Sequence, residues 1–376
     1  MNSVNDVIFL VLFVVMCVVF TVQLFYYLWF YLSVVTYKGH PGEDQSRPVS
    51  VIICARNEAE NLRMFLPAVL EQDYPSFEVI VVNDCSEDET DNVLGDMLLK
   101  YPNLKISSIN KDPKFTHSKK FAQFIGIKAA ASDLLLFTDA DCKPGSDKWL
   151  AGMVSGFTPG IEFVLGYGGY LRGKGLLNNY IRYDTSFIAM QYLGMAIRGV
   201  PYMGVGRNLA WNRQVFFRNK GFGSHNHIIS GDDDLFVNSN ATAGTTCVEF
   251  REDSHTRSVA ARDFTGWVKQ KQRHLTTGRY YKLRDKILLV AEPLSRVIFF
   301  TLSVVLLCFL YLWPWVTGIL GTRIIIQLVI FRLAAKKFRE PGLFFTSFLF
   351  DLFSPLINIS LYLSTFRNRS ARTSWK

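Results

Sequence analysis

The chain has 376 residues, a formal net charge of +9 and 49% hydrophobic residues, and its mean hydropathy is positive. This composition is too apolar for an ordinary soluble enzyme, and the length allows one large catalytic domain with accessory segments. The basic balance fits attraction to anionic lipid and to nucleotide phosphates. No helix-turn-helix, zinc-finger or RNP pattern accompanies the charge, so nucleic acid is not expected as a partner.

The six cysteines form no C-x-x-C pair and no framework spacing, which indicates a reduced, cytosolic domain. The apolar excess lies at the two ends of the chain. Residues 7–37 carry no charge and are long enough to cross a membrane. A cleaved signal peptide is the alternative, but no basic region precedes this run. Because Lys38 and Arg47 follow it, the positive-inside rule places the central domain in the cytoplasm, on the inner face of the cell membrane.

The C-terminal third returns to the membrane. Residues 297–322 are uncharged and contain Trp313-Pro314-Trp315. They form either one long span or two shorter ones that meet at this Trp-Pro-Trp turn. Residues 343–366 are the last apolar stretch, interrupted at Pro355, and basic residues flank it on both sides. Two cytoplasmic flanks around one span conflict; a hairpin broken at Pro355 would resolve this, as would another span count. We expect three or four spans in total.

Between these ends, short apolar runs alternate with helical patterns. The runs have the composition of buried strands and cover residues 49–54, 77–82, 105–109 and 134–137. Their alternation with helices predicts an α/β fold with a largely parallel, doubly wound sheet. The strand ends of such a sheet converge on one crevice, where ligands bind. Polar turns with acids or amides follow three of these runs, at residues 54–58, 83–88 and 138–142.

Asp139 and Asp141 stand one residue apart at the end of the strand 134–137. Two carboxylates placed in this way can hold Mg²⁺ or Mn²⁺ together with substrate phosphates. Asp84 could accept a hydrogen bond from a base or a ribose, or it could cap the following helix. Lys119 or Lys120 could neutralise a phosphate, or both could be solvated surface residues.

A second acidic centre, Asp232-Asp233-Asp234, follows Ser230-Gly231. Crowded like charges raise the pKa of at least one carboxyl group, which suits a general base for an incoming hydroxyl. The alternative is an acidic helix N-terminus that complements the helix dipole. Further on, residues 263–281 mix aromatic and basic side chains, as in a helix at the lipid headgroups. Gln270, Arg273 and His274 could share one face there, with Arg273 stabilising a leaving diphosphate.

Five motifs in order resemble the membrane-bound family 2 glycosyltransferases, which have a GT-A fold. They are Val51-Ile-Ile-Cys-Ala-Arg-Asn-Glu58, Val81-Val-Asn-Asp-Cys-Ser-Glu-Asp88, Thr138-Asp-Ala-Asp-Cys142, Gly231-Asp-Asp-Asp-Leu235 and Gln270-Lys-Gln-Arg-His274. The resemblance covers roughly residues 48–280. It is strongest to a subgroup typical of Bacteroidetes, similar in layout to cellulose and hyaluronan synthases.

The resemblance implies a GT-A, Rossmann-like domain flanked by transmembrane helices. It also implies inverting transfer from a UDP- or GDP-sugar to a membrane-associated acceptor, such as a lipid-linked sugar, a glycolipid or an envelope polysaccharide. On this basis Asp233 is the general base and Asp141, with Asp139, holds Mg²⁺ or Mn²⁺. Gln270 and Arg273 close over the diphosphate and the acceptor. The remaining candidates for substrate binding are Arg56, Glu58, Asp84, Lys119, Asp232 and His274.

Two positions depart from the family pattern. Asn83 replaces the usual first acid of the base-binding pair, and His274 replaces the tryptophan that follows the arginine. Since that tryptophan helps to position the acceptor sugar in processive synthases, we expect single-sugar transfer. A processive polysaccharide synthase is one alternative, and a catalytically inactive membrane scaffold is another. A nucleotidyltransferase would have a glycine-rich, basic phosphate loop near its start, which this chain lacks.

The expected organisation has five parts. They are an N-terminal transmembrane helix (1–37), a linker (38–47), a glycosyltransferase domain (48–258), a basic amphipathic interface segment (259–292) and a C-terminal transmembrane region (293–376).

Overall fold

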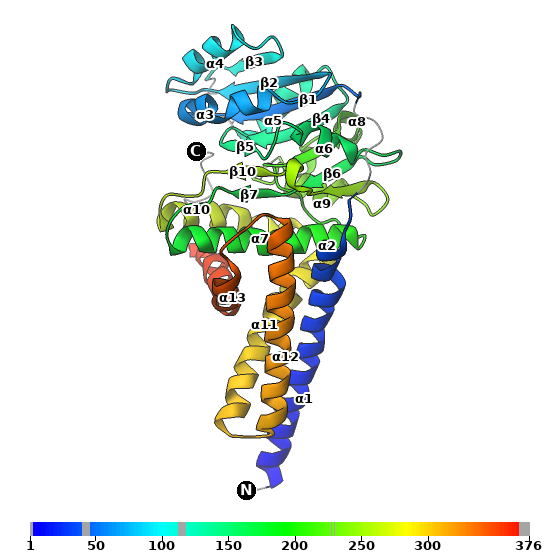
Figure 1. Ribbon diagram of the computed structural model, residues 1–376, viewed down its shortest axis with the longest axis vertical. Helices are drawn as coiled ribbons and strands as arrows, with labels where there is room; N and C mark the ends of the chain where they lie inside the picture. The colour runs from blue at the N-terminus through cyan, green and yellow to red at the C-terminus, as the bar shows by residue number, and fades with distance from the viewer. Residues whose placement is uncertain (1–2, 40–45, 112–117, 227, 229, 368–376) are drawn as a thin grey trace.

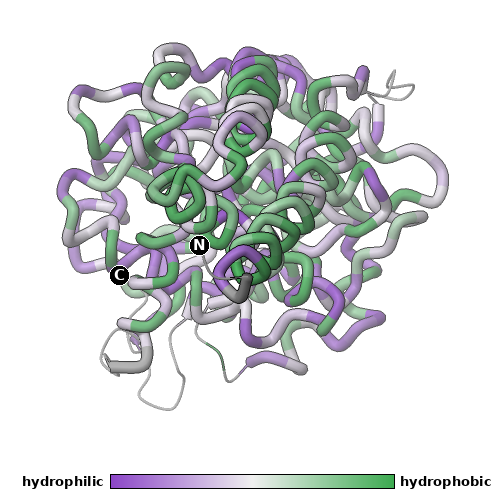
Figure 2. Tube along the Cα trace, turned by 90° about the horizontal axis from the view of Figure 1, so that it is seen from below, coloured by the Kyte–Doolittle hydropathy of each residue, from purple (hydrophilic) through white to green (hydrophobic). Residues whose placement is uncertain are grey.

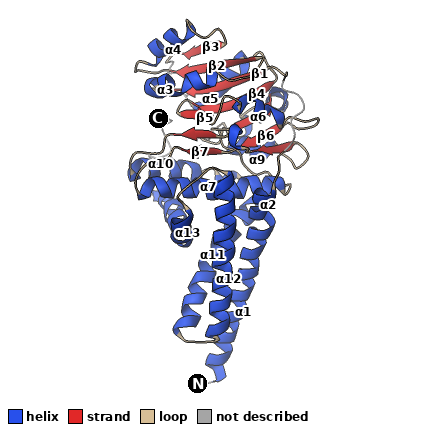
Figure 3. Cartoon of the chain, viewed as in Figure 1, coloured by secondary structure: helices blue, strands red, loops and turns tan. Residues whose placement is uncertain are grey.

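The computed structural model describes residues 3–39, 46–111, 118–226, 228 and 230–367. Most of the expected linker (40–45) and the end of the basic tail (368–376) lie outside the described residues. An α/β domain stands at one end of several long helices (Figures 1 and 3). The sheet lies farthest from the N-terminus, and helices α7 (Leu176–Ile197) and α10 (Phe264–Leu275) separate it from the long helices.

The central sheet has seven strands in the order β3-β2-β1-β4-β8-β6-β9. Strands β3 to β4 of this order run parallel, β8 runs antiparallel to both of its neighbours, and β6 and β9 are parallel to each other. The predicted, mostly parallel sheet is therefore confirmed. The strand bounds are β1 Val49–Ala55, β2 Phe77–Asp84, β3 Leu104–Ile109, β4 Leu134–Asp139, β6 Phe163–Gly166, β8 Leu209–Asn212 and β9 Thr246–Glu249.

Both faces of the sheet are covered, which explains why its strands read as continuous apolar runs. Ile52 and Cys54 of β1 belong to the core on the side of α5 (Lys119–Ala129) and α7 (Leu176–Ile197). Val51 and Ile53 face the other core, formed with α3 (Ala59–Leu70), α4 (Thr90–Leu98) and α6 (Trp149–Ser155). This alternation is the period of two that a strand imposes on its side chains.

A second, three-stranded sheet joins β5 (Cys142–Pro144), β10 (Thr256–Ser258) and β7 (Gly168–Tyr170). Residues 163–170 are thus divided between two sheets, with Tyr167 between β6 and β7. A β-carbon on Gly169 would lie 2.1 Å from Nη1 of Arg257, so a larger residue there would displace the end of that side chain. This small sheet begins directly after Asp141 and holds that turn in place.

Shorter elements complete the domain. They are α8 (Arg213–Arg218), α9 (Asp234–Asn240), α10 (Phe264–Leu275) and the 3₁₀ turns η2 (Gly223–His225), η3 (Glu252–Ser254) and η4 (Gly278–Tyr280). Asp263 caps α10 by accepting a hydrogen bond from the Gly266 amide at 2.7 Å. The amphipathic segment expected at 263–281 is therefore one helix followed by one tight turn.

Among the described residues, four helical segments are long and apolar enough to cross a membrane: Asn5–Thr36, Leu283–Cys308, Trp313–Lys337 and Phe344–Thr365. The first contains α1 (Ser3–Phe25), a π-helical turn η1 (Tyr26–Tyr31) and α2 (Leu32–Thr36). The others are α11 (Leu283–Cys308), α12 (Trp313–Lys337) and α13 (Phe344–Arg367). Seen from below, these helices carry many hydrophobic residues (Figure 2). Two helices rather than one cover this stretch, as the second alternative has it, but their connection is residues 309–312, and Trp313-Pro314-Trp315 forms the first turn of α12.

The hairpin that we considered at Pro355 does not form, because α13 is one continuous helix with Pro355 inside it. The contacts of α13 offer a different explanation for the basic residues on both sides of this apolar stretch. Phe350, in its first half, packs on Tyr180 of α7 with ring centroids 5.2 Å apart. Ser364, near its other end, accepts a hydrogen bond from Gln272 of α10 at 2.6 Å. Both halves of α13 thus contact the α/β domain, and we expect both of its ends to lie on the same side of the membrane.

Buried ion pairs tie the long helices together. Arg296 of α11 forms a pair with Glu292 at 2.5 Å and with Asp351 of α13 at 3.1 Å. Asp351 also pairs with Arg323 of α12, which in turn contacts Gln23 of α1 at 3.2 Å. The two arginines balance the two acids, as a buried site in an apolar region requires.

Candidate active site

One cavity of about 820 Å³ opens where the strand ends meet the helices below the sheet. Ten of the side chains that we singled out from the sequence line it: Arg56, Glu58, Lys119, Asp139, Asp141, Asp232, Asp233, Gln270, Arg273 and His274. Asp84 is not among its lining residues. It lies at the end of β2 and is fully buried. The sheet topology therefore gathers residues from distant parts of the chain, as parallel strands do at their carboxyl ends.

The turns after β1 and β2 are locked together by two hydrogen bonds. The Asn57 amide donates to Oγ of Ser86 at 2.9 Å, and Oδ1 of Asn57 accepts from the Glu87 amide at 2.7 Å. Asn57 and Cys85 have left-handed backbones, with φ of 55° and 54°. Such a conformation is uncommon for residues other than glycine and concentrates at functional sites. This fixed turn presents Arg56 and Glu58 to the cavity.

Asp139 ends β4 and Asp141 immediately precedes β5. One ligand atom from each of Asp139, Asp141 and Cys142 can be chosen so that all lie within 4.8 Å of one another. Burial and the negative charge of Asp139 raise the pKa of Asp141 above its ordinary value. A cation bound there would restore the ionised form. Burial also raises the pKa of the Cys142 thiol, which stays protonated. The two carboxylates suit a hard cation such as Mg²⁺ or Mn²⁺, and the protonated thiol does not.

Lys119 is held between the two acidic centres. Its Nζ lies 2.7 Å from Oδ1 of Asp139 and 3.4 Å from Oδ2 of Asp232. Burial alone would raise the pKa of Asp139, but the ammonium of Lys119 outweighs it and holds that pKa below its usual range. Of the two lysines that we considered, Lys119 is the one in the cavity. Lys120 instead donates to the carbonyl groups of His225 and Ile228, at 2.7 and 2.8 Å, and so serves the fold.

Asp233 sits at the N-terminus of α9. Its Oδ1 accepts a hydrogen bond from the Asp234 amide at 2.8 Å, and its Oδ2 accepts one from the Gly206 amide at 2.6 Å. Burial, together with the charges of Asp232 and Asp234, raises the pKa of Asp233 to about 7. The alternative for Asp232 or Asp234 is that their charge only complements the helix dipole; Asp234 lies in the first turn of α9, and the N-cap is Asp233. Its carboxylate is fixed in direction and can take up a proton near neutral pH.

The two neighbouring acids have different surroundings. Asp232 accepts a hydrogen bond from Gln123 at 2.9 Å and faces Lys119. Asp234 accepts hydrogen bonds from the hydroxyls of Thr277 and Tyr281, which lie between α10 and α11. It therefore fastens α9 to the segment that connects α10 and α11.

Arg207 is a cavity residue that the sequence did not single out. Its guanidinium carbon lies 4.3 Å from the ring centroid of Tyr170, whose hydroxyl accepts a hydrogen bond from Gln270 at 3.2 Å. Within the part of the chain that the structure describes, no carboxylate oxygen lies within 4.0 Å of this guanidinium. In the sequence, this loop is marked by Gly204 and Gly206 and by the polar pair Arg207-Asn208. Arg207 and Arg273 give the cavity positive charge beside the two acidic centres.

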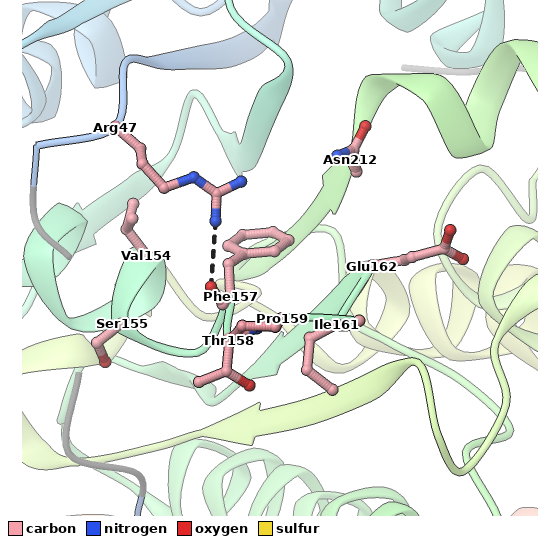
Figure 4. A pocket seen from close by; sticks show the side chains of 10 residues that line it. Arg47, Val154, Ser155, Phe157, Thr158, Pro159, Ile161, Glu162 and Asn212 are labelled. Atoms are coloured by element: carbon pink, nitrogen blue, oxygen red, sulfur yellow. Dashed lines mark hydrogen bonds between the residues drawn. The ribbon is translucent and has the colours of Figure 1, made fainter. Parts of the chain in front are cut away.

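A second cavity, of about 470 Å³, shares no lining residue with the first. Figure 4 shows Arg47 donating to the carbonyl oxygen of Phe157 there, at 3.1 Å. Glu162, at its edge, is paired with Arg218 at 2.9 Å. The two acidic centres, together with Arg207 and Arg273, lie in the larger cavity, which is therefore the candidate active site.

A mostly parallel sheet whose strand ends carry a D-x-D pair facing a second acidic centre defines a GT-A type of transferase. Residues 46–277 match the family model described as "Glycosyltransferase like family 2", and the chain belongs to that family and is a glycosyltransferase.

Comparisons with individual proteins agree. The chain is 36% identical over 121 residues to the glycosyltransferase AglE of Haloferax volcanii, an alignment that covers 31% of this chain and 38% of that protein. It is 36% identical over 98 residues to the probable glycosyltransferase YdaM of Bacillus subtilis, which covers 26% of this chain and 23% of the relative. The alignments thus span well under half of these relatives. In the structure of the mannosyltransferase PcManGT from Pyrobaculum calidifontis, the fold matches with a TM-score of 0.59 and 19% identity, over 93% of this chain and 98% of the other.

Proposed function

We propose that the protein is an inverting glycosyltransferase that moves a sugar from a UDP- or GDP-sugar to a membrane-associated acceptor at the cytoplasmic face of the cell membrane. The carrying observation is the single cavity that begins at Asp139 and Asp141 and continues to residues of α11 and α13. The solved mannosyltransferase of similar fold is described as a complex with GDP-Man and Mn²⁺, which supports a nucleotide-sugar donor and a divalent cation. At 19% identity, the similarity supports the fold alone, so the nucleotide base of the donor stays a proposal.

At the donor end, Asp139 and Asp141 would hold Mg²⁺ or Mn²⁺, whose charge offsets the charge that develops on the leaving diphosphate. Lys119, Arg207 and Arg273 supply further positive charge around that position. Arg56, Glu58 and Asp232 complete the donor side. Asp84, at the end of β2, is the proposed contact to the base or the ribose.

At the acceptor end, Asp233 is the proposed general base. It removes the proton from the acceptor hydroxyl as the oxygen attacks the anomeric carbon. The bond from that carbon to the diphosphate oxygen breaks on the opposite face, and the electron pair leaves with the nucleoside diphosphate. Inversion at the anomeric carbon follows from this single displacement. The carboxylate can take the proton near neutral pH because its pKa is raised to about 7.

Gln270, Arg273 and His274 lie on α10, between the acids and the membrane helices. They are the proposed closing group over the diphosphate and the acceptor. Since His274 occupies the position of the tryptophan that positions the sugar in processive synthases, the proposal is transfer of a single sugar. A processive polysaccharide synthase is the alternative. The proposed division of the chain keeps residues 48–258 as the transferase domain and 259–292 as the interface segment.

Calorimetric titration of the detergent-purified protein with UDP, GDP and dTDP, with and without Mn²⁺, tests this function. We expect one nucleotide to bind in a Mn²⁺-dependent manner, and Asp141→Asn to lose that binding. Asp96→Asn, on the exposed surface of α4, is the matched control and should bind as the wild type does. Failure of a folded wild-type protein to bind any of the three nucleotides would overturn the proposal.

A further inference from the structure

The large cavity does not end at the acidic centres. It continues between α11 and α13, where its lining includes six apolar or aromatic residues: Val290, Pro293, Leu294, Pro355, Ile359 and Tyr362. We call these six residues the groove. Leu289 lines the same stretch, as do the polar residues Glu292, Arg296, Ser354 and Asn358, among which Arg296 binds both Glu292 and Ser354. They lie in two of the helices that are long and apolar enough to enter a membrane. A space that joins a polar transfer site to apolar walls of this kind fits an amphipathic molecule.

Several side chains of the groove are exposed on the outer surface of the helices. Leu294 is 51% exposed, and Val290 and Ile359 are also exposed. The helices are nevertheless held close together beside it, since Arg296 donates to Oγ of Ser354 at 3.3 Å and to the carbonyl oxygen of Asp351 at 3.1 Å. In a bilayer, exposed apolar side chains of this kind contact lipid chains rather than water.

Two prolines contribute to the space between the helices. Pro293 of α11 and Pro355 of α13 both line the cavity. Proline inside a helix removes one backbone hydrogen bond and frees the carbonyl group four residues earlier. For Pro355 that carbonyl is the one of Asp351, and Arg296 satisfies it. Pro355 therefore lines the groove without leaving this carbonyl unpaired.

Positive charge lies between the groove and Asp233. Arg279 and Lys286 line the cavity, and within the described residues neither has a carboxylate oxygen within 4.0 Å. Lys271, by contrast, is neutralised by Asp184 at 2.5 Å. Arg279 lies in the turn η4 and Lys286 in the first turns of α11, at the domain end of the groove. The base suits a hydroxyl or a sugar, the two cations without a carboxylate partner suit a phosphate, and the apolar walls suit a hydrocarbon chain.

We propose that the groove binds the hydrocarbon chain of a phosphate-bearing lipid acceptor, with the phosphate beside Arg279 and Lys286. This inference rests on the proposed function and specifies its acceptor. Both halves of α13 contact the α/β domain, so the groove lies at the level where lipid headgroups meet that domain. A lipid can enter it sideways from the bilayer, and its polar end then reaches Asp233.

The test uses the full chain in phosphatidylcholine nanodiscs and two probes of equal chain length, dodecyl phosphate and dodecyl glucoside. Binding is measured by native mass spectrometry. We expect dodecyl phosphate to bind about tenfold more tightly than the glucoside, and Leu294→Trp to weaken both by about tenfold, which corresponds to excluding roughly two methylene groups. Val304→Trp, equally on α11 and exposed but outside the cavity, should leave both affinities unchanged.

The charge arm uses the double variant Arg279→Gln with Lys286→Gln, which should remove the preference for phosphate and keep the affinity for the glucoside. Equal binding of both probes by the wild type would overturn the phosphate assignment in favour of a neutral glycolipid. Equal binding by wild type and Leu294→Trp would overturn the groove. Mn²⁺-dependent nucleotide binding is measured on the same samples: its retention shows that Leu294→Trp is folded, and its absence in the wild type would overturn the proposed function rather than the groove.

Discussion

Lys119 and Asp139 form an ion pair in which Nζ and Oδ1 are 2.7 Å apart. This pair joins the start of α5 to the end of β4, at the place where Asp139 would contact a cation. The ammonium therefore competes with the metal for one carboxylate oxygen in the free enzyme. When a nucleotide diphosphate arrives, the same ammonium can turn to its phosphate oxygens.

Lys119→Met should tighten the binding of Mn²⁺ in the absence of nucleotide, by about three- to tenfold. The variant removes both the competing charge and its repulsion of the cation. Titration of Mn²⁺ followed by electron paramagnetic resonance measures this directly. Lys128→Met, at the exposed end of the same helix, is the control and should leave the Mn²⁺ affinity unchanged. Weaker Mn²⁺ binding by Lys119→Met would show that the lysine supports the metal site instead of competing for it.

Asp233→Asn should lower kcat by on the order of 10²–10⁴, because an amide cannot accept the proton of the acceptor hydroxyl. The side chain can still accept the hydrogen bond from Gly206 through its remaining oxygen, so Mn²⁺-dependent nucleotide binding should persist. Turnover is measured with the nucleotide-sugar that calorimetry identifies. Retained turnover would exclude Asp233 as the base, and lost nucleotide binding would indicate a collapsed site.

The rate should fall on the acid side with an apparent pKa of about 7, because the carboxylate of Asp233 must be ionised to act as a base. Asp232→Asn should move this limb to lower pH. It removes a negative charge that raises the pKa of Asp233, so the carboxylate stays ionised in more acidic solution. A pH–rate profile of both proteins checks the direction. An acid limb that is unchanged in Asp232→Asn would assign the titration to another group.

The sheet and most of the site could be predicted because their information is local. The parallel strands read as apolar runs, and the polar residues that follow these runs fall at the same sheet edge, which places Asp139 and Asp141 in one crevice. The motif around Asp233 could be assigned to the same site by its family pattern. Arg207 could not, since its role depends on Tyr170 and on a loop from another part of the chain. The same holds for the division between β6 and β7, which pair with strands from different parts of the chain.

The ion pairs among the long helices give a stability prediction. Asp351→Leu would leave Arg323 buried without a carboxylate and should destabilise the protein by about 3–5 kcal/mol. Adding Arg323→Met removes the unpaired charge, and Arg296 keeps its pair with Glu292. We therefore expect the double variant to recover most of the loss in Tm, measured in detergent. A double variant no more stable than Asp351→Leu would show that Arg323 does not depend on this acid.

The packing of α13 gives a prediction about topology. If both its ends lie on the side of the α/β domain, cysteines placed at Phe345 and Leu363 should react with a membrane-impermeant maleimide from the same side of the membrane. Both side chains are exposed in the structure. The native Cys308 lies at the opposite end of α11, next to the turn that leads into α12, and it should react only from the other side. Phe345→Cys and Leu363→Cys are therefore made in a Cys308→Ser background, and Cys308 of the wild type serves as the reference for labelling from the other side of the membrane.

Labelling of Phe345→Cys and Leu363→Cys from opposite sides would mean that α13 crosses the bilayer. The contact between Gln272 and Ser364 could then not persist in the membrane, since it holds the end of α13 against the domain.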